Sequence, residues 1–260
     1  MTDDLLRRAQ LLGLYGMVAN WSEMRTHDLV RRVIELEEAE RQRRSLERRL
    51  KRSKVGAFKP MADFDWGWPS KIDRQQIESV LALDFRADNA NVILVGPNGV
   101  GKTTIARNVA HEALRAGMTV LSVKASELVA DLAVQDTSVA LQRRLRRYVN
   151  PALLVIDELG YLSHDDRQGD LLFEVVSKRH ERAPIVLTTN KPFAEWNEVF
   201  PNSSCVTALV DRLVHRAEIV VIEGQSYRAK EAKERASRQA SARRAPAADR
   251  KPRPRREERG

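Results

Sequence analysis

The sequence predicts an α/β fold in which helices flank a five-stranded parallel sheet, with a small helical domain before the sheet and a basic tail after it. Three observations predict the sheet. A short apolar run at residues 92–95 leads directly into a glycine-rich segment that opens a helix. A second apolar run ends in Asp157 and Glu158, and a third ends in Thr189 and Asn190. Because the carboxyl ends of parallel strands share one edge of a sheet, we expect these polar residues to converge.

The length of 260 residues accommodates one well-packed domain and a smaller module. We expect a helical domain for DNA binding and assembly at residues 1–59, a nucleotide-binding domain at 60–228 and a disordered tail at 229–260. Residues 55–70 are rich in Gly, Pro and aromatic residues, which is typical of a linker that packs on a domain edge. For Trp66 and Trp68, such packing is favoured over stacking on nucleic-acid bases.

The net charge of +9 is concentrated in two arms. Residues 41–59 carry nine basic residues against one acid, and residues 228–260 carry thirteen against five, whereas residues 60–227 carry eighteen against twenty-two. This pattern predicts a polyanionic partner, most simply double-stranded DNA, although solvated charge runs would look the same. The candidate DNA-binding residues of the first arm are Arg41, Arg43, Arg44, Arg48, Arg49, Lys51, Arg52 and Lys54.

Cysteine usage and hydropathy indicate a protein of the reducing cytoplasm. Cys205 is the only cysteine, so an intrachain disulfide is excluded. No apolar run approaches the roughly 18 residues of a membrane span, and we expect no membrane association.

The first third of the chain is expected to be helical. Apolar residues recur at mixed helical spacings over residues 5–21, although Gly13 and Gly16 interrupt them. Thr26 or Asp28 is expected to cap a second helix that continues into the charged residues 37–52. A further helix is predicted at residues 72–85, directly before the first strand.

The glycine-rich segment after the first strand matches the phosphate-binding pattern G-x-x-x-x-G-K-[ST]. Glycines let successive backbone N–H groups surround phosphate oxygens, and the following helix directs its positive end at the same anion. Lys102 would reach the β- and γ-phosphates of ATP, and the Thr103 hydroxyl would ligate Mg²⁺. The residues assigned to this loop are Gly96, Pro97, Asn98, Gly99, Val100, Gly101, Lys102, Thr103 and Thr104.

The remaining elements alternate between helices and strands, as expected for a parallel sheet. The tail from about Lys230 lacks apolar periodicity and is expected to be disordered. After the loop we predict helices at residues 105–114, 127–132, 139–149 and 206–217, another that begins near Asp165, and strands at 118–123, 153–156, 185–188 and 219–222.

The strand ends supply the second half of the expected ATP site. Asp157 is placed to hold Mg²⁺ through water, and Glu158 to polarise the attacking water. Asn190 would orient that water from the neighbouring strand. Arg212 and Arg216 lie one turn apart on a helix, where an exposed arginine would enter a neighbouring subunit's ATP site.

This order of motifs resembles an AAA+ ATPase core, and further motifs are similar to the IstB family of transposition helper ATPases. The resemblance covers residues 5–228 and extends to the DnaC-like helicase loaders, which share the core. The motifs that carry it are D-F-D-W at 63–66, A-E-W-N-E-V at 194–199, D-R-L-V-H at 211–215 and V-I-E-G-Q-S-Y-R at 221–228.

The resemblance implies an ATP-dependent homo-oligomer that assembles on duplex DNA, remodels it and recruits an integrase-type transposase. It also implies that Lys102, Glu158 and Asn190 are catalytic and that Arg212 is the finger acting in trans, with Arg216 as its rival. Two alternatives remain at this point. One is a helicase loader that uses the same nucleotide switch, and the other is a passive DNA-packaging protein with a vestigial nucleotide site.

Overall fold

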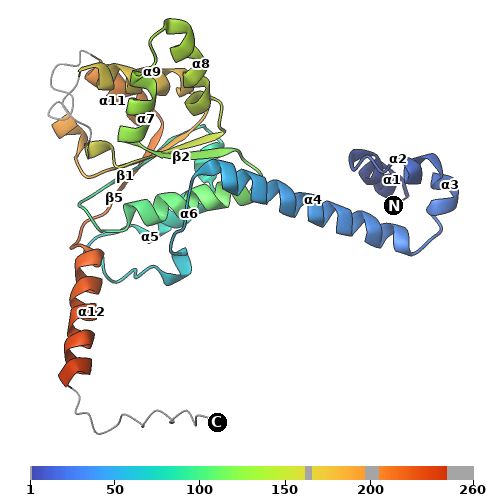
Figure 1. Ribbon diagram of the computed structural model, residues 1–260, viewed down its shortest axis with the longest axis horizontal. Coiled ribbons are helices and arrows are strands. Elements are labelled where there is room, and N and C mark those ends of the chain that lie inside the picture. Colours follow the sequence, from blue (N-terminus) through green and yellow to red (C-terminus); the bar gives the residue numbers. More distant parts are fainter. Residues whose placement is uncertain (1, 162–165, 197–204, 245–260) are drawn as a thin grey trace, which may run out of the picture.

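A computed structural model describes residues 2–161, 166–196 and 205–244 (Figure 1). Five strands form a parallel sheet in the order β2-β3-β4-β1-β5. The predicted parallel α/β sheet is thus confirmed, and each strand lies within two residues of its expected position. The strands are β1 (Asn91–Val95), β2 (Val120–Lys124), β3 (Leu153–Asp157), β4 (Ile185–Thr189) and β5 (Ala217–Val221).

Two helical layers cover the sheet, because successive strand residues point to opposite faces. In β1, Ile93 contributes to one apolar cluster, whereas Val92 and Leu94 contribute to the other. Figure 1 shows one face covered by α5, α6 and the end of α4, and the other by the remaining helices of the sheet domain. The helices of the first layer are α4 (Leu29–Ser53), α5 (Arg74–Ala82) and α6 (Lys102–Arg115). Those of the second layer are α7 (Ala125–Ala133), α8 (Ser138–Val149), α9 (Asp166–Arg179) and α11 (Val206–Val214).

A buried arginine fixes the segments that precede β3 and β4. Arg179, at the end of α9, donates hydrogen bonds of 2.7–3.0 Å to the carbonyls of Tyr148, Val149, Pro151 and Pro184. Burial lowers the pKa of its guanidinium to about 10, which still leaves the group charged at neutral pH. One side chain therefore holds the starts of both β3, which ends at Asp157, and β4, which is followed by Asn190.

The amino-terminal module, defined here as residues 2–34, is more divided than predicted. Residues 5–21 were expected to form one helix, but a break at Gly13, whose φ is 64°, separates α1 from α2. Neither expected cap is formed at α4, because the Thr26 hydroxyl donates to the Glu23 carbonyl and Asp28 makes no side-chain capping bond. The module's helices are α1 (Thr2–Leu11), α2 (Tyr15–Ala19), α3 (Trp21–Met24) and the first part of α4.

Helix α4 runs from the module to the sheet domain without interruption (Figure 1). Near its start, Val30 and Ile34 pack in the module's apolar cluster. Near its end, Leu46 and Leu50 pack against the core on the α6 side of the sheet, and Arg49 donates a 3.0 Å hydrogen bond to the Leu114 carbonyl of α6. The second half of the expected amino-terminal domain is therefore packed onto the sheet domain.

The carboxyl-terminal segment differs from the expectation of a tail without regular structure. Helix α12 spans Tyr227–Arg244, and residues 245–260 of the expected tail lie outside the described residues (Figure 1). No helix in the described part of the chain is both long and apolar enough to cross a membrane. Short 3₁₀ helices complete the description at Met61–Asp63, Asp84–Arg86, Leu159–Tyr161 and Phe193–Glu195.

Candidate active site

The glycine-rich loop between β1 and α6 has the shape that its sequence predicts. Gly99 and Gly101 adopt φ angles of 82° and 103°, a region that favours glycine. A Cβ at Gly99 would lie 2.2 Å from Ser226 Oγ, and one at Gly101 would lie 2.6 Å from the Phe64 ring. At these two positions only a glycine fits, and α6 begins directly after the loop at Lys102 with its amino terminus facing the same space.

Lys102 is held against the loop that it is expected to serve. Its ammonium donates to the carbonyls of Gly96 at 2.6 Å and Pro97 at 2.7 Å. Burial lowers the pKa of Lys102, the negative charge of Asp157 raises it and the positive charge of Arg228 lowers it, and together these effects bring it to about 8. A bound triphosphate would supply the anionic partner that favours the charged amine.

This pKa predicts that ATP binding weakens as pH rises. Only the charged ammonium attracts phosphate, and with a pKa of about 8 most of it is neutral at about pH 9. The Kd for ATP is therefore expected to be about tenfold larger at about pH 9 than at about pH 7, as measured by calorimetry. The Lys102→Arg variant, whose charge does not titrate in this range, should show a flat dependence. An unchanged Kd for the native chain would contradict the assignment.

Asp157 lies at the carboxyl end of β3 in a network of hydroxyl groups. It is buried, and its Oδ1 accepts from Thr103 Oγ1 at 3.0 Å and from Thr188 Oγ1 at 2.5 Å. The Thr188 hydroxyl in turn accepts from the backbone N–H of Glu158 at 2.9 Å. A carboxylate and a threonine hydroxyl side by side are hard oxygen donors, so Thr103 and Asp157 fit a Mg²⁺ ion.

Glu158 is held in a sparsely populated backbone conformation. Its φ is 63°, in the left-handed region. Its carboxylate forms an ion pair with Lys124 at the end of β2, in which Nζ lies 2.8 Å from the carboxylate oxygen. The hydrogen bond from Lys124 to Glu158 raises the pKa of that lysine. Backbone strain of this kind is typical of functional sites, because the surrounding structure must impose it.

Asn190 follows β4 and lies beside the turn after β3. A Cβ at Gly160 would be 1.8 Å from Asn190 Oδ1, so glycine permits the amide to approach. That oxygen is buried and has no hydrogen-bond partner among the described residues. A buried unpaired amide oxygen is costly unless water or substrate binds it, which fits a role in orienting water.

One cavity of about 700 Å³ brings the expected groups together. That volume is suitable for a nucleotide. The cavity's walls include Lys102, Thr103, Asp157, Glu158 and Asn190, together with the loop residues from Asn98 to Thr104. Of the expected loop residues, Gly96 and Pro97 are not part of its lining; their carbonyls instead bind Lys102.

The cavity also has walls that the sequence analysis did not assign. Its lining includes Arg228 at the start of α12, and Thr188 and Lys124 from the strand ends. Trp68 packs as predicted, since its Nε1 donates to the Gln225 carbonyl at 2.8 Å, but it also lines the cavity. For Phe64, Tyr227 and Arg228 the signal was present in the motifs 63–66 and 221–228, which carry the resemblance but had no role assigned to them. The other aromatic residues of the lining are Phe64 and Tyr227.

The two candidate finger arginines lie at the far edge of the sheet. Both precede β5, whose carboxyl end adjoins the loop through the hydrogen bond from Ile222 N to Val95 O. Neither arginine lines the cavity of its own chain, and Arg216 is separated from it by the length of β5, about 16 Å for five residues. Arg212 donates to Ser177 Oγ and lies 4.5 Å from the Phe173 ring centroid, whereas Arg216 is exposed and has no side-chain partner among the described residues.

The candidate DNA-binding arm is helical up to Ser53, and its residues are of four kinds. Three arginines form ion pairs with glutamates on the same helix, and Arg49 is engaged by α6. Lys54 terminates the helix in a left-handed conformation. The paired arginines are Arg41, Arg43 and Arg44, and the exposed residues within the helix that have no partner in the described part of the chain are Arg48, Lys51 and Arg52.

Comparisons with known proteins agree with this geometry. The family model of IstB-like ATP binding proteins matches residues 8–236. A candidate ATP-binding protein of insertion sequence IS5376 from Geobacillus stearothermophilus is 37% identical over 229 residues, which cover 85% of this chain and 91% of that protein. The corresponding protein of insertion sequence IS21 from Pseudomonas aeruginosa is 37% identical over 191 residues, covering 74% of this chain and 72% of that protein.

Among solved structures, the crystal structure of DnaI is similar with a TM-score of 0.52. The match is 21% identical and covers 66% of this chain and 90% of that chain. A likeness at this level of identity shows the fold alone, which is a parallel sheet flanked by helices.

Proposed function

The chain belongs to the family of IstB-like ATP-binding proteins, and from this premise we propose that it hydrolyses ATP to control its own assembly on DNA during transposition. The observation that carries the proposal is the single cavity in which the phosphate loop, Asp157, Glu158 and Asn190 meet. The names of the most similar relatives place those proteins in insertion sequences. This association favours a transposase as the partner over the helicase of the alternative hypothesis.

The cavity suggests how ATP lies in it. The loop's backbone N–H groups and the amino terminus of α6 would receive the phosphates, with Lys102 and Arg228 supplying positive charge. The adenine would lie toward the aromatic walls formed by Trp68 and Tyr227, whose ring centroids are 6.0 Å apart. Mg²⁺ held by Thr103 and Asp157 would neutralise charge on the phosphates.

Hydrolysis requires a water in line with the bond between the γ-phosphorus and its bridging oxygen. Glu158 would take the proton from that water as it attacks, and Asn190 would orient it, so that the bridging bond breaks and ADP leaves. The ion pair with Lys124 competes for the Glu158 carboxylate. A shift of Lys124 is therefore part of the proposed activation.

Completion of the site by a neighbouring subunit would couple hydrolysis to assembly. The finger arginine must come from another chain, since β5 separates both candidates from their own cavity. The contacts of Arg212 with Ser177 and Phe173 would have to break for it to act, whereas Arg216 is exposed. We therefore transfer the proposed finger role from Arg212 to Arg216.

We propose that duplex DNA binds along the basic half of α4. The three unpaired basic residues Arg48, Lys51 and Arg52 would contact phosphates without reading bases, so binding would be tolerant of sequence and sensitive to salt. The DNA-bound assembly would then recruit and stimulate the transposase, and hydrolysis would release it.

Sedimentation on mixed-sequence duplex DNA tests the proposal. Large complexes are expected with ATP and not with ADP. Replacing Arg48, Lys51 and Arg52 with Ala should weaken DNA binding and reduce the slope of log K against log salt by about 2 to 3, since each lost phosphate contact removes about 0.9.

The matched control is the variant in which Arg41, Arg43 and Arg44 become Ala. It removes the same charge from the same helix, but these arginines are paired with glutamates, so the slope should change less. If the salt slope is the same for the native chain and for the variant that lacks Arg48, Lys51 and Arg52, the DNA-binding surface lies elsewhere than on α4. Complexes that form equally with ATP and ADP would overturn the nucleotide-controlled assembly and favour a passive DNA-binding role.

A further inference from the structure

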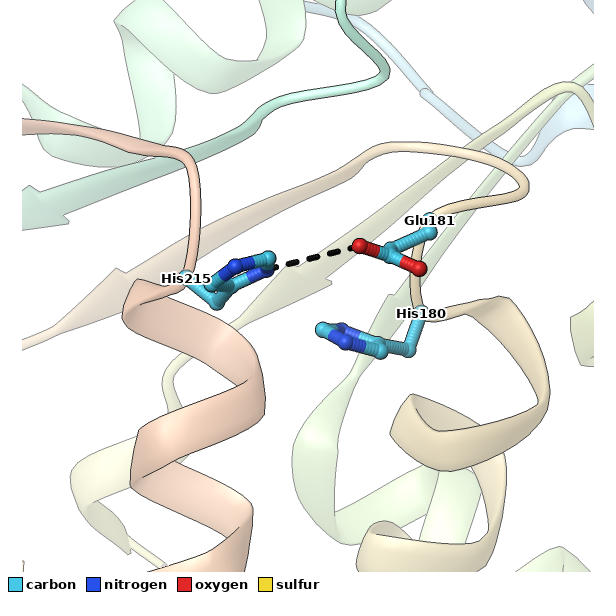
Figure 2. A group of neighbouring side chains, drawn as sticks. All are labelled: His180, Glu181 and His215. Carbon is cyan, nitrogen blue, oxygen red and sulfur yellow. Dashed lines mark ion pairs between the residues drawn. The ribbon is translucent and has the colours of Figure 1, made fainter.

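Two histidines and a glutamate meet at the edge of the sheet opposite to the nucleotide cavity. His180 follows the last residue of α9, Glu181 comes next in the turn to β4, and His215 follows the last residue of α11, with Arg216 between it and β5 (Figure 2). One ligand atom from each residue lies within 4.8 Å of those from the other two. The Nδ1 of His215 is 3.8 Å from the Glu181 carboxylate, and the two imidazole centroids are 5.3 Å apart.

The fold, rather than chance side-chain orientation, brings these groups together. The backbone N–H of His180 donates to Val176 O at 2.8 Å, and that of His215 donates to Asp211 O at 2.9 Å, so each histidine continues the hydrogen bonding of its helix. Glu181 adopts a φ of 58°, which turns the chain sharply and directs its carboxylate toward His215 (Figure 2). Three potential ligand side chains, two from the turn after α9 and one from the residue after α11, therefore face one another.

The chemistry of this position suits a cation. The carboxyl ends of two helices converge there, and each contributes partial negative charge, in addition to the formal charge of Glu181. Arg179, one residue before His180, does not take part, because its guanidinium donates hydrogen bonds to the carbonyls of neighbouring loops. Two imidazole nitrogens with one carboxylate oxygen match the donors that Zn²⁺ takes with a solvent molecule in the fourth position.

We propose that His180, Glu181 and His215 form a binding site for a divalent transition-metal ion such as Zn²⁺. The side chains are exposed or half-buried, so small rotations bring the three donors from their present separation to the roughly 2.0–2.2 Å bonds of zinc. The site is distinct from the hard-oxygen pair Thr103 and Asp157. Since His215 directly precedes Arg216, a bound ion would also immobilise the segment carrying the proposed finger, a consequence that rests on the proposed function.

Co²⁺ absorption and Zn²⁺ calorimetry on the full chain test the site, with excess Mg²⁺ present to saturate the hard-oxygen pair. One ion per chain is expected, with the visible spectrum of a site that contains imidazole ligands. His180→Ala, His215→Ala and Glu181→Gln should each weaken binding at least about tenfold, the minimum seen when even a supporting group of a metal site is lost. Unchanged circular dichroism would show that the variants are folded.

The chain offers a matched control in His111. Its Nδ1 lies 3.7 Å from the carboxylate of Glu112, so it reproduces a histidine–glutamate pair without the second histidine. His111→Ala should therefore leave binding unchanged. The proposal is overturned if His180→Ala and His215→Ala bind as tightly as the native chain, if His111→Ala loses as much, or if thiolate charge-transfer bands assign the ion to Cys205. In these cases the cluster is only an ion pair between a histidine and a glutamate.

Discussion

Replacing Glu158 with Gln is expected to slow ATP hydrolysis by roughly 100-fold or more while ATP still binds. The substitution keeps the size of the side chain, but it removes the negative charge that takes a proton and that pairs with Lys124. Asp157, Thr103 and the loop are untouched, so the Kd for ATP should remain close to that of the native chain. A steady-state phosphate-release assay and calorimetry measure the two quantities separately.

This variant also separates assembly from turnover. If hydrolysis releases the protein from DNA, complexes of the Glu158→Gln chain should persist after ATP is added, whereas those of the native chain should decay. Lys124→Met is the companion variant, because it removes the ion pair and leaves the Glu158 carboxylate unpaired. Normal hydrolysis by Glu158→Gln would show that another group activates the water.

Replacing Arg216 with Ala is expected to reduce DNA-stimulated hydrolysis by roughly 1,000-fold or more, as for other arginines that complete a phosphoryl-transfer site from a neighbour. ATP binding by the isolated chain should be unaffected, because Arg216 lies beyond reach of its own cavity. Arg212→Ala is the informative comparison. That change removes contacts with Ser177 and Phe173, so its main expected effect is a lower melting temperature.

Mixing experiments distinguish a finger from a merely structural arginine. Chains carrying Arg216→Ala have an intact cavity, and chains carrying Lys102→Ala have an intact Arg216, so a mixture should recover part of the activity that each lacks alone. Absence of recovery, together with full activity of Arg216→Ala, would return the finger role to Arg212 or place it elsewhere.

The sheet could be predicted because its strands are short apolar runs that end in polar residues. Residues 92–94 and 153–156 are buried, and apolar runs that are buried on both faces of a sheet have few alternative structures. Helix α12 was not predicted because the search relied on an apolar face, and this helix has none. Its Ala, Arg, Lys and Glu residues favour helix by intrinsic propensity alone.

The convergence of the phosphate loop with the polar strand ends was predicted, because the carboxyl ends of parallel strands share one edge of a sheet, but the individual contacts across the sheet were not. Lys102 and Thr103 belong to one contiguous motif. The contact of Asp157 with Thr188, by contrast, depends on how β3 and β4 lie beside each other, and the Lys124–Glu158 ion pair depends on β2 beside β3. A sequence reports the composition of each strand, but register is decided by packing of the whole sheet.

Helix α4 makes the amino-terminal module the end of a lever. Its fixed end is the part packed on the sheet domain, where Arg49 donates to the Leu114 carbonyl near the end of α6, the helix that begins at Lys102. From Arg49 to Val30 the helix spans about 28 Å, so a tilt of about 5° at the fixed end would swing the module by about 2 to 3 Å. A small movement of α6 on nucleotide exchange would thus be amplified mechanically at a distance, with no joint in between to absorb it.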